Sequence, residues 1–122
     1  MSYDLQLGVK VEGGDNLFVT VATPERDNPT YNLRDMFVAC MDWGYRQGEW
    51  YSVPDVLPKI QHGINELKFN GAAYKKYNAT NGWGTVESAL LHLESLEKCI
   101  QETCVEGGKW GEIPMKLLYM RW

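Results

Sequence analysis

A glycine- and tryptophan-rich break stands directly before a strongly amphipathic segment of the chain. It reads Asn81-Gly82-Trp83-Gly84-Thr85, and the apolar residues after it have helical spacing. The N-terminus of a helix presents unpaired N–H donors and a partial positive charge, so it can hold an anion without a catalytic group. Glycine lets a ligand approach the backbone, and the Trp83 ring offers a stacking face. Asn81, Trp83 and Thr85 are therefore candidate ligand-binding residues. The alternative, which composition favours, is a tight connection with Trp83 anchored in the core.

Cations and aromatic residues in loops or at the end of the sequence supply further candidates. Arg26 lies in a long polar connection, Tyr31 and Asn32 follow it at an expected helix start, and Arg121 and Trp122 come last. Arginine grips phosphate through two hydrogen bonds and also stacks on rings. If these side chains converge with the Trp83 break, they form one nucleotide pocket. A frayed end for Arg121 and a core anchor for Tyr31 are the alternatives.

The motifs of familiar catalytic sites are missing from the sequence. It contains no GxSxG elbow, HExxH pair, Walker loop or dinucleotide-binding GxGxxG. Cys40, Cys99 and Cys104 lack CxxC spacing and fall in expected helices, a setting typical of reduced, inert thiols. His62 and His92 have no partner at metal-ligand spacing. We expect a binding protein with no metal and no cofactor rather than an enzyme.

Composition limits the class of partner. The chain has 122 residues, 44% of them hydrophobic, which suits one compact domain over residues 1–122 with a real core. Its net charge of −4 argues against DNA or RNA as a partner, because nucleic-acid binding needs clustered Lys and Arg. No signal peptide and no apolar run of membrane-spanning length are seen, so we expect a cytoplasmic protein without membrane contact.

Periodicity predicts an α+β fold, a three-helix bundle decorated by a small antiparallel sheet. The alternating segment Tyr3–Val11 turns at residues 13–16 into a second strand, and the tail alternates well enough for a third strand, with a short terminal helix as the alternative. Asn32 is the expected N-cap of the first helix, Ser52 of the second and Thr85 of the third. The expected elements are strands at Tyr3–Val11, Leu17–Val21 and Met115–Trp122, and helices from Leu33 to about Trp43, from Ser52 to about Tyr77, and from Thr85 to the Gly107-Gly108 break.

Two apolar residues fall on the polar faces of their helices. Phe69 projects away from the apolar stripe of the second helix, and Leu91 stands among charged residues of the third. Single apolar residues on a surface are normal. The sharper interpretation is a contact with another copy of the chain, which makes a homo-oligomer. A further alternative is a protein-binding inhibitor, such as an anti-CRISPR protein or a host-enzyme modulator, that acts through this helix surface.

Three segments carry a resemblance to a known family. The opening Tyr3–Val11, the segment Pro29–Asn32 before a helix and the break Asn81–Gly84 resemble the sponge-type Thoeris anti-defence proteins of phages and prophages. The resemblance covers nearly the whole chain through short motifs. It implies a helical bundle with a small sheet, assembled as a homo-oligomer with ligand pockets between subunits.

The resemblance implies immune evasion by sequestration in the cytoplasm of an infected bacterium. Members of the family bind the cyclic ADP-ribose isomers that a bacterial TIR-domain protein makes, and so keep the signal from its effector. Some relatives hold cyclic oligonucleotides at a separate site. The basic C-terminal residue of the family matches Arg121, and the aromatic residue at the helix break matches Trp83; Arg26, Tyr31, Asn32 and Asn81 follow more weakly. Such a pocket stacks on adenine and contacts the pyrophosphate.

Overall fold

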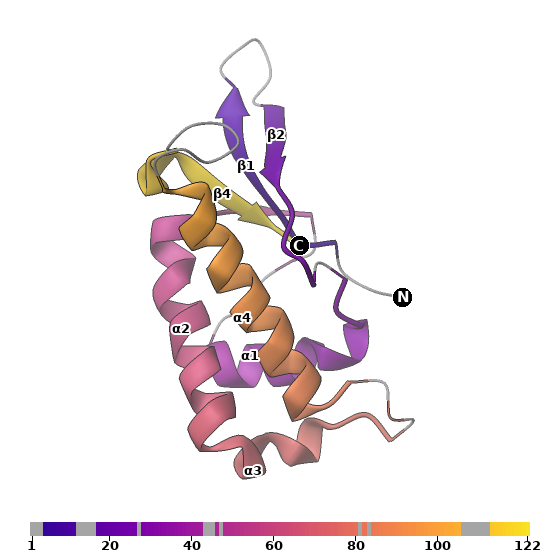
Figure 1. The fold of residues 1–122 in the computed structure, drawn as a ribbon. Helices are drawn as coiled ribbons and strands as arrows, with labels where there is room; N and C mark the ends of the chain where they lie inside the picture. Colours follow the sequence, from indigo (N-terminus) through magenta and orange to yellow (C-terminus); the bar gives the residue numbers. More distant parts are fainter. Residues whose placement is uncertain are drawn as a thin grey trace.

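Four α-helices and one four-stranded antiparallel sheet make up a mixed α/β fold. The computed structural model describes residues 4–11, 17–26, 28–42, 46, 48–80, 82, 84–105 and 113–122, and for Tyr31 the backbone alone. α2 (Val53–Phe69) and α4 (Val86–Thr103) lie side by side, α1 (Arg34–Met41) crosses them, and the first two strands project beyond the helices as a hairpin (Figure 1). The α+β expectation is confirmed at this level, whereas the three-helix bundle stays a prediction.

The sheet has the strand order β2-β1-β4-β3. β1 (Gln6–Val11) and β2 (Leu17–Ala22) form the expected antiparallel hairpin, and its turn and Tyr3 lie outside the described residues. The tail forms the expected strand rather than a terminal helix, but it begins later than predicted, since a 3-10 turn, η3 (Met115–Leu117), leads into β4 (Leu118–Arg121). β4 pairs with β1 and with β3 (Trp50–Ser52), a three-residue strand that the sequence did not reveal. The last strand of the chain therefore lies inside the sheet.

The first helix begins later than predicted. A 3-10 turn, η1 (Tyr31–Leu33), precedes α1 (Arg34–Met41), and Leu33 stands at the N-cap position. The backbone N–H of Asn32 donates to Thr30 Oγ1 over 3.3 Å, so the Thr30 side chain accepts a hydrogen bond from the 3-10 turn. The expectation that Asn32 caps this helix is wrong, because the tighter turn comes before the α-helix proper.

The second predicted helix is divided. α2 (Val53–Phe69) continues through Pro58 without a break, and Val56, Ile60 and Ile64 on either side of the proline are buried in the core. It ends before Asn70 and is followed by α3 (Gly71–Tyr74) and η2 (Lys75–Tyr77). The predicted continuous helix to Tyr77 is therefore wrong beyond Phe69.

The third predicted helix is α4 (Val86–Thr103), with Thr85 as its N-cap as expected. α4 ends at Thr103, so the expectation that it runs to the Gly107-Gly108 break is wrong beyond that residue; the two glycines themselves lie outside the described part of the chain. α2 packs against both α4 and α1, and Gly63 of α2 lies at this junction. A Cβ on Gly63 would stand 2.6 Å from Met41 Cγ, which shows how closely the helices approach there.

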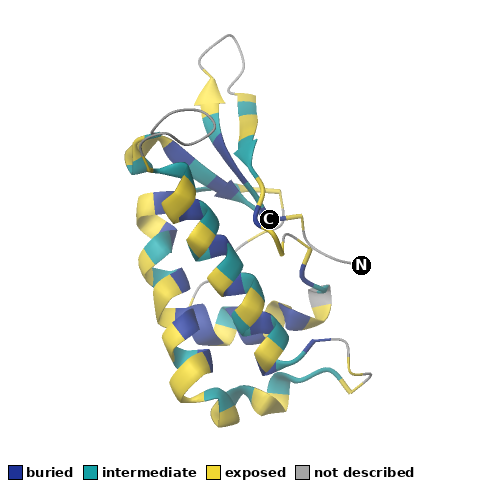
Figure 2. Cartoon of the chain, viewed as in Figure 1, coloured by how far each residue is buried: buried dark blue, intermediate teal, exposed yellow. Residues whose placement is uncertain are grey.

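The part of the sheet next to the helices has one face toward them and one face away, whereas the outer part of the β1–β2 hairpin projects beyond them. Leu5, Leu7, Leu118 and Met120 are buried in the core between sheet and helices, and Tyr51 packs against it. The alternate strand residues are absent from this core and are half-buried or exposed, except for the small Gly8. Figure 2 shows buried residues where the sheet meets the helices and mostly exposed or half-buried ones on the projecting hairpin. We call the surface formed by the alternate residues the open sheet face.

Candidate functional site

The start of α4 is capped by the protein's own side chains. Thr85 and Ser88 form a capping box, in which the Ser88 N–H donates to Thr85 Oγ1 over 3.2 Å and the Thr85 N–H to Ser88 Oγ over 2.8 Å. The Val86 N–H donates to Asn78 Oδ1 over 3.0 Å. These backbone N–H groups belong to the helix N-terminus that was predicted from the sequence as an anion site. A ligand at this end would have to displace the capping bonds, so the predicted role of Thr85 in ligand binding gains no support here.

Replacing Thr85 by alanine should lower the free energy of unfolding by about 1 kcal/mol, the usual cost of losing an N-cap side chain. Urea denaturation followed by circular dichroism measures this change. Thr80→Ala is the matched control, because Thr80 is exposed in the loop before α4. Equal stability of the two variants would show that the capping box does not stabilise α4.

The segment that carries Tyr31 and Asn32 lies against the residue before this cap. Gly84 has a φ of +119°, which favours glycine, and a Cβ there would stand 3.0 Å from Leu33 Cδ2. The backbone of η1 is therefore next to the α4 N-terminus, as a shared pocket would require. Asn81, Trp83 and the Tyr31 side chain lie outside the described residues, so their role in ligand binding stays a prediction.

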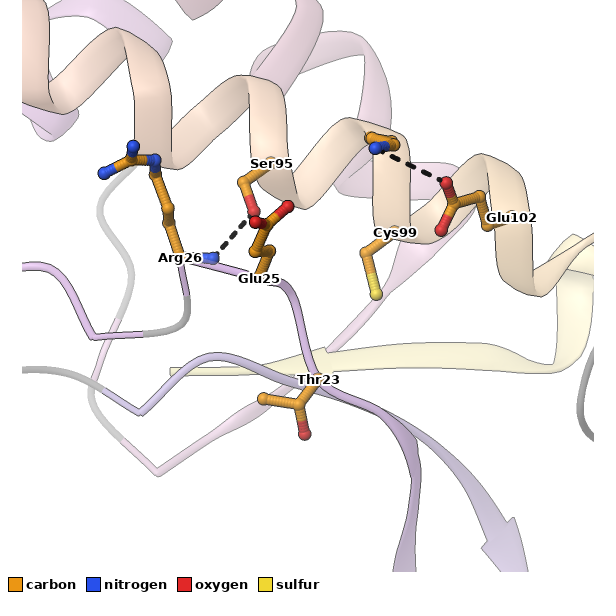
Figure 3. Close-up of a pocket in the computed structure, with 7 residues that line it drawn as sticks. Thr23, Glu25, Arg26, Ser95, Cys99 and Glu102 are labelled. Carbon is orange, nitrogen blue, oxygen red and sulfur yellow. Dashed lines mark hydrogen bonds and ion pairs between the residues drawn. The ribbon is translucent and has the colours of Figure 1, made fainter.

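Arg26 lies in a different place, beside the middle of α4. Its backbone N–H donates to Ser95 Oγ over 2.9 Å, and its carbonyl oxygen accepts from His92 Nδ1 over 3.0 Å. Ser95 is ten residues beyond Thr85, or about 15 Å along the helix. A cleft of 340 Å³ opens there (Figure 3). It is lined by Thr23, Glu25, Arg26, Ser95, Lys98, Cys99 and Glu102. Its two carboxylates balance its two cations, so it offers an anion no net attraction.

Arg121 lies on the open sheet face, among aromatic rings. Its guanidinium carbon is 4.7 Å from the centroid of the Phe18 ring, and its Nη2 donates to Gln6 Oε1. The same Gln6 oxygen accepts from Thr20 Oγ1 over 3.1 Å. Arg121 is half-buried and held from two sides. This arrangement fixes the plane of the guanidinium, which is what a planar recognition group needs.

Two further rings and a second cation complete the cluster. The Phe18 and Trp50 centroids are 5.3 Å apart, with an angle of 43° between the rings. The Lys10 ammonium lies 4.5 Å from the Tyr119 centroid and 5.7 Å from that of Trp50. Both distances fall within the reach of a cation–π interaction, about 6 Å. We call these five residues, Lys10, Phe18, Trp50, Tyr119 and Arg121, the sheet-face cluster.

The contact between Phe18 and Trp50 depends on Gly8 and on the curl of the sheet. These rings stand on the two edge strands, which would be about 14 Å apart in a flat sheet of four strands. The register of β1 and β2 shifts between Leu7 and Gly8, and such a bulge increases the local twist. A Cβ on Gly8 would stand 2.4 Å from Phe18 Cζ, so the Phe18 ring occupies the space that a side chain on Gly8 would fill.

The charge of the four described strands is concentrated in this cluster. Their sequences, QLGVKV, LFVTVA, WYS and LYMR, contain no Asp or Glu and two cations, Lys10 and Arg121. Both cations stand on the open face and over rings. The whole chain has a net charge of −4. The sheet-face cluster is therefore a local basic and aromatic surface on an acidic protein, suited to a flat anionic ligand.

The candidates from the sequence fall into three places in one chain rather than one pocket. Thr85 and the backbone of η1 lie at the α4 N-terminus, Arg26 beside the middle of α4, and Arg121 on the open sheet face. Trp122 is buried toward the helices, with its ring 5.5 Å from that of Phe37 in α1. Trp122 therefore packs in the core, on the opposite side of the sheet from Arg121.

Sequence reasoning missed four members of the cluster, Lys10, Phe18, Trp50 and Tyr119. A signal was present, because β1 and β4 each alternate apolar residues, including the buried Leu7, Leu118 and Met120, with polar, aromatic or basic ones. The pairing of β4 with both β1 and β3 brings those alternate residues together, and this pairing cannot be read from local pattern.

Two of the described cysteines, Cys40 and Cys99, have thiols whose pKa is raised by burial, that of Cys40 to about 12. Thiols with a raised pKa are poor nucleophiles, because the thiolate is the reactive form. Among the residues whose placement is described, no three His, Cys, Asp or Glu side chains are grouped to hold a metal ion.

No protein-family model, curated protein or solved structure matches the chain. No helix within the described ranges has both the length and the apolar character needed to cross a membrane.

Proposed function

We propose that the protein binds a nucleotide of the cyclic ADP-ribose class without converting it, and so withholds it from its receptor. The observation that carries the proposal is that both cations of the sheet lie over aromatic rings on one open face. Rings of this kind stack on a base, and Arg and Lys pair with phosphate. A sequestering protein needs these contacts and no catalytic group.

The identity of the ligand rests on the resemblance to the Thoeris anti-defence sponges. Under it, the ligand is a cyclic ADP-ribose isomer made by a bacterial TIR-domain protein, and the site of action is the cytoplasm of the infected cell. Sequestration works by mass action, so the protein must rival the signal in concentration. A homo-oligomer, with the exposed Phe69 and Leu91 in contact with another copy, belongs to the same proposal.

Calorimetry with the purified protein tests the proposal. We would titrate it with cyclic ADP-ribose isomers and with cyclic trinucleotides, then denature the complex and identify the released compound by mass spectrometry. Tight binding with release of the intact nucleotide supports sequestration. Release of a converted product would indicate an enzyme instead, and no heat with any of these compounds would overturn the proposal.

A protein-binding inhibitor is the second candidate, favoured by one observation. The Phe69 side chain at the end of α2 is 76% exposed, and Leu91 of α4 is 45% exposed. An exposed large apolar side chain can serve as the anchor of an interface. This candidate predicts a stable complex with a host protein that Phe69→Ser abolishes and that nucleotides do not affect.

A further inference from the structure

Lys10 covers the ring faces on which a base would stack. It stands on β1 with an exposed side chain, and its ammonium approaches Tyr119 and Trp50, which come from two other strands. A planar base of a ligand would seek the same faces, because they are the flat apolar surfaces beside the two cations. Lys10 and the base therefore compete for one position.

The two cations of the cluster differ in how firmly they are held. Arg121 is half-buried, stacks on Phe18 and donates to Gln6. The Lys10 ammonium has the two ring faces and a flexible four-carbon stem, which lets it turn aside at low cost. Because the described strands bear no carboxylate, no strand carboxylate would capture the displaced ammonium. An anionic group on a ligand stacked against these rings would give the ammonium a new partner.

We propose that Lys10 makes the sheet face selective for ligands that carry both a flat ring and a phosphate, an inference that rests on the proposed function. In the structure the Lys10 ammonium lies over the Tyr119 and Trp50 rings. A nucleotide displaces it with the base and then receives it on a phosphate, so the lost cation–π contact is replaced by a charge-assisted bond. A nucleoside displaces the ammonium but has no phosphate to bind it. Inorganic phosphate can bind the ammonium but has no ring to stack on Tyr119 and Trp50.

Lys10→Met tests this inference, because methionine is unbranched and only one atom shorter than lysine but carries no charge. The affinity for cyclic ADP-ribose should fall about tenfold or more through loss of the phosphate contact. The affinity for adenosine should rise about two- to fivefold, because the ring faces no longer have to be cleared of a cation. Opposite changes for the two probes are the expected signature, measured by calorimetry for the nucleotide and by NMR titration for adenosine.

Lys76→Met is the matched control. The Lys76 ammonium lies 5.3 Å from the Tyr77 centroid in η2, so the variant removes a cation–π contact of the same kind away from the sheet. Both affinities should stay unchanged in it.

The outcomes separate the inference from the proposed function. If the parent protein binds cyclic ADP-ribose but Lys10→Met shifts both probes in the same direction, or neither, the selective role of Lys10 is overturned and sequestration stands. If the parent protein binds none of the nucleotides, the proposed function fails, and the inference fails with it.

Discussion

Arg121→Ala should reduce the affinity for cyclic ADP-ribose by about a hundredfold or more, the effect of losing two charge-assisted hydrogen bonds to phosphate. The guanidinium stacks on Phe18 and is oriented by Gln6, so its free N–H edge can meet a phosphate without loss of side-chain entropy on binding. The backbone of Arg121 pairs with Gln6 and with Trp50 whatever the side chain is. The fold should therefore survive the substitution, and calorimetry beside a thermal melt would show both results.

Two variants sharpen this result. Arg121→Lys keeps the charge but loses the planar fork, and it should recover only part of the affinity. Arg26→Ala removes an arginine that the sequence also suggested for the ligand, but its backbone is bonded to the helix layer at His92 and Ser95. It should leave the affinity unchanged. Unaltered binding in Arg121→Ala, or a large loss in Arg26→Ala, would move the site from the sheet to the cleft beside α4.

The local elements of the fold were predictable because their causes are local. The apolar stripe that begins at Val86 predicts α4, and Thr85 before it predicts the N-cap. The alternation of apolar and polar residues predicts β1 and β2. The start of α1 was missed because a 3-10 turn precedes the helix. The Thr30 hydroxyl accepts a hydrogen bond from the Asn32 N–H in this turn, so Asn32 does not stand at the N-cap. The strand β3 was missed because three residues are too few for a periodic signal.

The candidate site was only partly predictable, because it is built by strand order. Arg121 was identified from its chemistry, yet its partners Phe18 and Trp50 lie more than 70 residues away in sequence and on opposite edges of the sheet. Neighbouring residues of a strand point to opposite faces, which is why Arg121 belongs to the cluster and Trp122 to the core. Sequence chemistry singled out the arginine as a candidate, whereas the rings that the structure places around it depend on long-range pairing.

Gly8→Ala should lower the free energy of unfolding by about 3 kcal/mol, the upper end of the cost of overpacking. The new Cβ would stand 2.4 Å from Phe18 Cζ and 2.5 Å from the Val19 carbonyl oxygen. The ring could turn away, but the carbonyl belongs to the paired backbone of β2 and can move only by distorting the hairpin. Urea denaturation measures the loss. Gly71→Ala is the matched control, because its Cβ would meet Val86 Cγ1 at 3.2 Å in a helix that gains from alanine, and its stability should change by less than about 1 kcal/mol.

The same substitution connects the packing of the sheet to ligand binding. The Phe18 ring lies over Gly8, and the Arg121 guanidinium stacks on that ring. Displacing the ring would therefore remove the stacking contact that orients the guanidinium. We expect Gly8→Ala to weaken nucleotide binding at a temperature where the variant is still folded, and Gly71→Ala to leave binding intact. Full affinity in a folded Gly8→Ala protein would mean that the ligand does not depend on the position of Phe18, and hence that the sheet-face cluster is not its site.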